Sequence, residues 1–255
     1  MEVKLLDYQE NALDILLYTK NTRLKSEMSL GDIHSKDYAW KLDQLAYMHD
    51  TIKSSWEFAT YMFEVTGVSR AFTHQVVRTR TASFAQEAQR VVNLDDFDYI
   101  LPKTIAGSLS ELPYFKIMED AAATYTRLVE DGIPRQDARN VIPTGVLTSI
   151  IIGANLRTLH NMAEVRLCAR VQDEYQRVFK EMKLRVVEVH PWAEDFIQVF
   201  CVNHGTCCFP RYEECPIQKY TIQGEQLADA KNKLRREHQD MDFEANPIVK
   251  DGKTM

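Results

Sequence analysis

The sequence predicts an α+β protein with more helix than strand, and three observations lead to this class. Short apolar, β-branched runs at residues 2–6 and 144–155 are typical of strands, whereas stretches such as 111–132 have the apolar spacing of helices. The chain has 255 residues and 45% hydrophobic content, which allows one substantial core. Because the sequence also has no internal repeat, we expect one domain over residues 1–222 and a polar C-terminal extension over 223–255.

The first third of the chain is expected to alternate between strand and helix. Residues 2–6 form a short strand pattern, and residues 9–20 carry leucines at helical spacing. An aspartate can cap a second helix over 37–50, which has a broad apolar side. Residues 56–65 are rich in aromatic and β-branched types and predict a strand. A serine then caps a helix over about 69–78.

The rest of the domain is expected to be mainly helical. The 111–132 stretch predicts a long helix ended by its glycine, and the proline two residues later suits the first turn of another helix. Residues 144–155 are continuously apolar and predict a fully buried strand, with a core helix as the alternative. Two more helices are expected over 155–167 and 173–190. The polar last ten residues, 246–255, are expected to be disordered.

The charge balance limits the partners of the chain. The formal net charge is −6, so we expect no general attraction to nucleic acid or to an anionic membrane. The N-terminus lacks the uninterrupted apolar run of a secretory signal, and no stretch is long enough to cross a bilayer. We therefore expect a soluble, cytoplasmic protein in which any anion site is local.

Three arginines lie close together in this acidic chain. They are Arg78, Arg80 and Arg90 of the stretch VVRTRTASFAQEAQR, residues 76–90. Gln75 and Arg78 are three residues apart and would share one face of the predicted helix. The later residues lack a helical period, so Arg80 and Arg90 are expected on irregular backbone. Guanidinium groups suit phosphate because they offer forked donors to its oxygens, and a solvated charged turn is the alternative.

Two further segments place polar side chains beside apolar sequence. Arg139 ends the segment GIPRQDAR, just before the predicted strand at 144–155. A second segment, NLRTLHNMAEVR, contributes Asn155, Arg157, Asn161 and Arg166. Buried charges without partners are costly, so such arginines face either a ligand or an acid. Structural pairing with Glu164 or Glu174 is the alternative interpretation.

Together these segments resemble the flavin-dependent thymidylate synthases, the ThyX family. The family signature is RHRxASxNExSxRY, and residues 78–90 correspond in order to its first thirteen positions. GIPRQDAR is similar to the family's GxPRExAR, and NLRTLHNMAEVR is similar to its NxRSLxNFLxLR. The resemblance covers roughly residues 37–200. It implies a ThyX-like fold of helices packed on a mostly antiparallel sheet, and a homotetramer with active sites shared between subunits.

The resemblance also implies a reaction and its site residues. ThyX-like enzymes methylate dUMP at C5 to give dTMP, with FAD, NADPH and 5,10-methylenetetrahydrofolate. Their flavin would be lined here by Ser54, Arg78, Thr79, Arg80, Thr81, Gln86, Asn155, Arg157 and Asn161. Their nucleotide would be held by Gln75, Arg78, Gln86, Ala88, Arg90, Arg139 and Arg166. Arg90 and Arg139 would bind the phosphate, and Arg166 would be the catalytic residue, because its charge beside N3 and O2 favours the anionic pyrimidine.

Four positions within residues 78–90 differ from the signature. Thr79 replaces histidine, Ala85 replaces asparagine, Gln86 replaces glutamate and Ala88 replaces serine. A nucleophile at position 88 is therefore excluded. Either an ordinary thymidylate synthase has drifted, or the enzyme traps the exocyclic methylene with water and forms a 5-hydroxymethyl product from dUMP or dCMP. A noncatalytic nucleotide-binding protein is the alternative of a different class.

The cysteines form a separate cluster near the end of the domain, within residues 201–215. Its members are Cys201, Cys207, Cys208 and Cys215. Their spacing is not a paired zinc knuckle, so we expect free thiols and no metal, with these four residues as the candidates if one binds.

Overall fold

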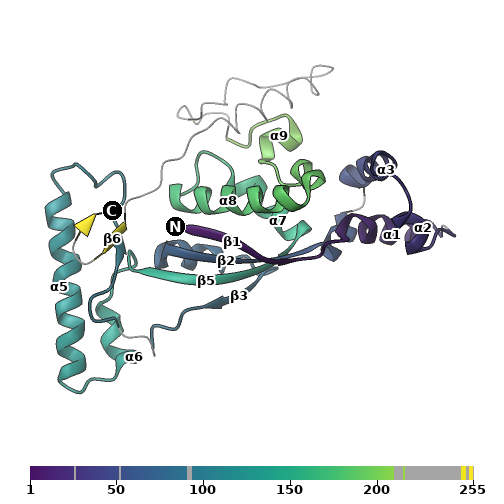
Figure 1. Cartoon of the computed structure of the whole chain (residues 1–255). Helices are drawn as coiled ribbons and strands as arrows, with labels where there is room; N and C mark the ends of the chain where they lie inside the picture. Colours follow the sequence, from purple (N-terminus) through teal and green to yellow (C-terminus); the bar gives the residue numbers. More distant parts are fainter. Residues whose placement is uncertain are drawn as a thin grey trace.

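The computed structural model describes residues 1–25, 27–51, 53–90, 94–209 and 215, together with 248–250 and 253–254. At its centre lies a four-stranded sheet in the order β1-β2-β5-β3 (Figure 1). Its strands are β1 (Glu2–Tyr8), β2 (Thr60–Ser69), β5 (Leu147–Asn155) and β3 (Ser83–Gln86). All three pairings in this sheet are antiparallel, so the expected mixture of helices and a mostly antiparallel sheet is confirmed.

Helices cover one face of this sheet (Figure 1). They are α7 (Leu156–Arg166), α8 (Asp173–Val189) and α9 (Phe200–His204). Side chains alternate along each strand, so every second residue of β2 and β5, such as Phe63 and Ile152, is buried in the main core. Met62 and Ile151 lie on the other face and are 42% and 37% exposed. The expectation of a fully buried strand at 144–155 was therefore wrong: β5 is half-buried.

Further elements lie at the two ends of the sheet (Figure 1). One end carries α1 (Ala12–Leu24), α2 (Leu30–His34), α3 (Tyr38–Thr51) and the 3-10 turn η1 (Lys53–Phe58). The other end carries β4 (Tyr99–Ile100), α5 (Glu111–Glu130), α6 (Arg135–Ala138) and the 3-10 turn η2 (Arg139–Val141). A second, smaller core there includes Met118 and Tyr125 of α5. A third 3-10 turn, η3 (Pro191–Phe196), follows α8.

Several predicted boundaries differ from the structure. The strand expected over 56–65 begins only at Thr60, because the aromatic Trp56 belongs to η1 and packs edge-on against His160 and Phe196 at 4.9 and 4.8 Å between ring centroids. The helix expected over 69–78 ends at Val76. The long helix ends at Glu130, two residues before Gly132, whose φ of 83° suits the predicted glycine stop.

The described part of the C-terminal extension forms strands, not the disordered end that we expected. β6 (Ile248–Lys250) pairs with β4, and β7 (Lys253–Thr254) pairs with β6. The rest of the predicted extension, residues 223–247, 251–252 and 255, lies outside the described residues. None of the helices in the described ranges combines the length and apolar character that a bilayer crossing requires.

Candidate active site

The helix α4 (Arg70–Val76) carries Gln75 and leads into the signature stretch. It packs against the start of α8. Ser69 caps α4 by accepting a hydrogen bond from the Phe72 N–H at 3.0 Å. Ser69 in turn donates from its backbone N–H and its hydroxyl to the buried Glu174 carboxylate, at 2.7 and 2.5 Å. The Gln75 amide donates to the side chain of Gln172, just before α8. The start of α8 thus fixes both ends of α4.

Arg166, the expected catalytic residue, ends α7 above an aromatic ring. Its Cζ lies 4.3 Å from the ring centroid of Tyr175, which is fully buried in α8. Burial raises the pKa of Tyr175, while Arg166 and Thr79 beside it act in the opposite direction. No carboxylate among the described residues pairs with Arg166. Its charge is therefore not neutralised within this part of the chain.

Two further guanidinium groups, those of Arg70 in α4 and Arg139 in η2, lie near each other. Arg70 donates from Nη2 to the backbone oxygen of Glu87 at 2.9 Å, and its Nε is buried without a partner. Burial lowers the pKa of Arg70; the Glu87 carboxylate opposes this shift and the like charge of Arg139 adds to it. Arg139 donates to the Gln136 backbone oxygen at 3.2 Å. Arg70 thus has one carboxylate and one further cation near it, so positive charge is in excess, an arrangement that favours an added anion.

Arg70 was not among the site residues predicted from the sequence. It is the first residue of α4, directly after the capping serine, and this place on the site helix was the one available signal.

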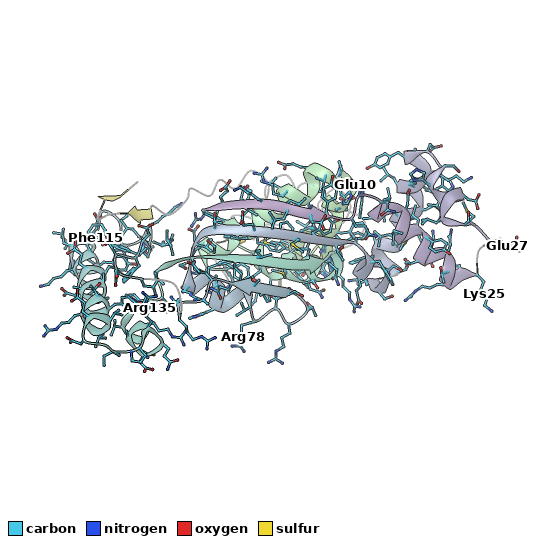
Figure 2. The ribbon with its side chains drawn as sticks, turned by 60° about the horizontal axis from the view of Figure 1, so that its bottom comes forward. Glu10, Lys25, Glu27, Arg78, Phe115 and Arg135 are labelled. Carbon is cyan, nitrogen blue, oxygen red and sulfur yellow. The ribbon has the colours of Figure 1, made fainter. Side chains whose placement is uncertain are left out.

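The other signature arginines are exposed. Arg78, Arg80 and Arg90 lie in turns, and their side chains form no hydrogen bond or ion pair with the described residues. Figure 2 shows Arg78 at the β3 edge of the sheet. The expectation of irregular backbone at Arg80 and Arg90 is confirmed, although the residues between them include the unpredicted strand β3. These groups are accessible to a ligand.

A cavity of about 660 Å³ lies where β1 ends and β2 begins. Its lining includes Thr81 and Asn155, both expected beside the flavin, together with Glu57 and Ser83. Asn155 accepts a hydrogen bond from the Thr158 N–H at 2.8 Å and so caps α7. The Thr158 hydroxyl donates to the Thr81 backbone oxygen at 3.2 Å. The signature stretch and α7 therefore meet at this cavity.

The remaining residues expected near the flavin lie around the start of α7 and η1. Arg157 pairs with Glu57 at 2.5 Å, so neither Glu164 nor Glu174, the acids considered from sequence, is its partner. Ser54 accepts a hydrogen bond from Arg23 of α1. Asn161 is exposed on α7, one turn after Arg157.

The divergent signature positions form a patch along β3. The Gln86 amide donates to the Thr73 hydroxyl at 2.6 Å, which ties β3 to α4. Ala85 and Ala88 are exposed and have no polar side-chain atom. A nucleotide beside this patch therefore meets fewer hydrogen-bonding groups than the family signature provides.

The cysteines line a different cavity, of about 400 Å³, on the helix-covered side. The residues are Cys168, Cys201, Cys207, Cys208 and Cys215. Burial raises the pKa of Cys201 to about 12. His204 bonds to Glu164 at 2.9 Å. Across the described ranges, no three potential ligands are grouped as a metal ion requires.

Comparisons with known proteins identify the family and support the fold. A family model described as thymidylate synthase complementing protein, Thy1, matches residues 4–192. The chain belongs to the Thy1 family. Among its relatives is a flavin-dependent thymidylate synthase from Sulfurisphaera tokodaii, 30% identical over 212 residues and covered to 80% in both chains. Another, from Clostridium tetani, is 32% identical over 228 residues, which span 81% of this chain and 90% of the relative.

Two solved structures share the fold of this Thy1 protein. The flavin-dependent thymidylate synthase ThyX of Helicobacter pylori, complexed with FAD and dUMP, aligns with a TM-score of 0.61 and 19% identity, over 78% of this chain and all of that one. The UMP/dUMP methylase PolB of Streptomyces cacaoi, bound to 5-Br dUMP, aligns with a TM-score of 0.64 and 20% identity, over 76% and 93% of the two chains. The family model and the relatives confirm the resemblance to the ThyX family, and these structures support its fold.

Proposed function

We propose that this Thy1 protein methylates dUMP at C5 to give dTMP, with FAD as redox cofactor, NADPH as reductant and 5,10-methylenetetrahydrofolate as carbon donor. The chain matches relatives named flavin-dependent thymidylate synthase over most of their length, which supports this reaction. The observation that carries the proposal is the Arg166 guanidinium, which lies beside the start of the signature stretch without a carboxylate partner among the described residues.

The residues around the larger cavity suit a flavin. Thr81 and Asn155 line this space of about 660 Å³, and Arg157 and Ser54 lie on adjoining elements. These groups supply hydroxyl, amide and guanidinium contacts, and the two acids of the lining, Asp7 and Glu57, are exposed. FAD, when bound, supplies the redox chemistry, so the protein's own task is to bind, orient and polarise.

Arg166 is assigned the electrostatic part of catalysis. C5 of uracil is a poor nucleophile, and a cation beside N3 and O2 stabilises the anionic ring and raises electron density at C5. A salt-bridged arginine would act weakly, because its partner would offset its charge. Arg166 instead rests on a neutral ring, 4.3 Å from Tyr175.

The phosphate is assigned to Arg90 and Arg139. Arg90 is exposed and unpaired among the described residues, and Arg139 places a second positive charge near Arg70, whose acidic neighbour is Glu87. A dianionic phosphate would balance this excess through forked hydrogen bonds. Gln75 and Gln86, on α4 and β3, lie on the elements that flank this region.

We further propose the homotetramer with shared active sites. The open face of the sheet exposes Leu6, Met62 and Ile151, and apolar side chains gathered on one face suit contact with another copy of the chain. Light scattering measures the molar mass of the purified protein in solution. A homotetramer predicts four times the mass of one chain.

A second candidate is 5-hydroxymethylation of dUMP or dCMP. The patch along β3 favours it, because Ala88 offers no hydroxyl and Gln86 carries an amide that can donate as well as accept. The two candidates differ in what adds to the exocyclic methylene once the carbon is on C5: addition of a hydride gives the methyl product, and addition of water gives the hydroxymethyl product.

Product mass tests both candidates. The protein is incubated with FAD, NADPH, 5,10-methylenetetrahydrofolate and either dUMP or dCMP, and the mass of the nucleotide product is measured by mass spectrometry. We expect dUMP to gain a methyl group, whereas a hydroxymethyl gain would support the second candidate. Arg166→Ala should abolish turnover and keep FAD bound. Arg185 is a partly exposed arginine that pairs with Glu188 on α8, so Arg185→Ala should leave turnover intact. A colourless protein without turnover would overturn both enzymatic candidates.

A further inference from the structure

Tyr175 is a buried tyrosine at the edge of the proposed site, and its hydroxyl lacks a hydrogen-bond partner. Its side chain is fully buried, and its hydroxyl has no hydrogen-bond partner of good geometry. Buried polar groups normally find a partner, so an orphan hydroxyl calls for a reason. Two side chains lie beside this hydroxyl, Arg166 and Thr79, and both favour its ionised form. These are also the residues assigned to the pyrimidine and to the flavin.

The ring of Tyr175 is fixed from the other side. It packs edge-on against Phe72 of α4, with ring centroids 5.1 Å apart and planes at 88°. Its neighbour Glu174 holds the α4 cap through two hydrogen bonds from Ser69. The ring therefore has little freedom to move relative to the site helix, and it is a rigid support for the Arg166 guanidinium above it.

An aromatic support differs from an acidic one in what it does to the charge. A carboxylate would orient Arg166 but would also offset its positive charge. The face of a phenol ring attracts a guanidinium through its quadrupole and leaves the net charge in place. A phenol hydroxyl can also accept a hydrogen bond from a guanidinium N–H while it donates one to the hydroxyl of Thr79. Such bonds are often loose in a ligand-free protein and tighten in the complex.

We propose that Tyr175 is a positioning residue that holds the Arg166 guanidinium on its ring and connects it to Thr79 through its hydroxyl. Thr79 is the position at which this chain departs from the signature histidine. The Tyr175 hydroxyl thus links the group that polarises the pyrimidine with the group beside the flavin. This inference rests on the proposed function, and it assigns Tyr175 a role in orienting Arg166 during turnover rather than in binding either ligand itself.

Three variants and one control test this role. Tyr175→Phe keeps the ring and removes the hydroxyl, Thr79→Val removes the other end of the link, and the double variant combines them. Tyr125→Phe is the matched control, because Tyr125 in α5 is also fully buried with an unpartnered hydroxyl and lies in the second core. FAD absorbance and urea unfolding of each protein establish that cofactor binding and folding are retained.

We expect Tyr175→Phe to lower kcat about tenfold, as the loss of a hydrogen bond to a charged group predicts, with KM for dUMP and FAD content nearly unchanged. Thr79→Val should lower kcat similarly, and the double variant should lose no more than the worse single variant, because both break one link. Tyr125→Phe should keep full kcat. Unchanged kcat in Tyr175→Phe, or additive losses in the double variant, would overturn the inference.

A separate measurement distinguishes this inference from the proposed function. If the wild-type protein forms no product from dUMP, the proposed function fails. Titration of the FAD-loaded protein with dUMP then tests only whether the Tyr175 ring supports the Arg166 guanidinium. Tyr175→Leu, which lacks the ring, should weaken dUMP binding as much as Arg166→Ala does. Equal dUMP affinity in wild type and Tyr175→Leu, or no dUMP binding by the wild type, would overturn the role of Tyr175.

Discussion

Replacing Ser69 with alanine tests how the site helix is held. The Ser69 hydroxyl caps α4 and also donates to the buried Glu174 carboxylate at 2.5 Å. Loss of an N-cap costs about 1 kcal/mol. Loss of a hydrogen bond to a charged group costs about 1.5–3 kcal/mol, because the buried oxygen keeps no substitute partner. We therefore expect Ser69→Ala to lower the free energy of unfolding by about 3 kcal/mol.

Ser29→Ala is the control for this prediction. Ser29 caps the exposed helix α2 by accepting from the Asp32 N–H at 3.2 Å, and its hydroxyl meets no buried acid, so its loss should cost about 1 kcal/mol or less. Urea unfolding at one fixed protein concentration measures both variants, since assembly makes stability depend on concentration. If the two variants differed by less than about 0.5 kcal/mol, the proposed strength of the Ser69–Glu174 contact would be refuted.

Three further predictions concern nucleotide binding, pH and thiol reactivity. Arg139→Ala should weaken dUMP binding about tenfold or more in calorimetry, and an unchanged dissociation constant would remove it from the phosphate site. Burial lowers the pKa of His190, which accepts a hydrogen bond from Tyr61 at 3.0 Å, so the unfolded chain binds the proton more readily. The urea midpoint should therefore fall as pH drops below about 6.5, and it should fall less in His190→Phe. Burial raises the pKa of Cys201 to about 12, so iodoacetamide near neutral pH should alkylate the exposed Cys208 first, as peptide masses would show; faster alkylation of Cys201 would contradict this.

The elements with strong periodicity could be predicted from the sequence. The α5 and α8 helices have clear apolar stripes, and β5 is a β-branched run, so their types and approximate bounds were correct. β3 was missed because Ser83–Gln86 has little strand propensity of its own. It is a strand because its register pairs Ser83 with Gly153 and Gln86 with Ile150 of β5, a contact that local sequence does not reveal.

The candidate site was predicted as residues but not as contacts. The family signature located Arg78 and Arg80, and the similar segment NLRTLHNMAEVR located Arg166, because the resemblance is written in sequence order. The side chains that contact these arginines could not be found from the signature. Tyr175 and Thr79 are far apart along the chain and meet only because α8 packs against α4. A residue that acts through another side chain has no pattern of its own in a single sequence.

A crystal structure of the protein with FAD and dUMP would test the assignment of the arginines most directly. The proposed function predicts the phosphate between Arg90 and Arg139, and the pyrimidine against Arg166 with the flavin on its other side. A nucleotide bound away from Arg166, or a flavin absent from the cavity at Thr81 and Asn155, would contradict it.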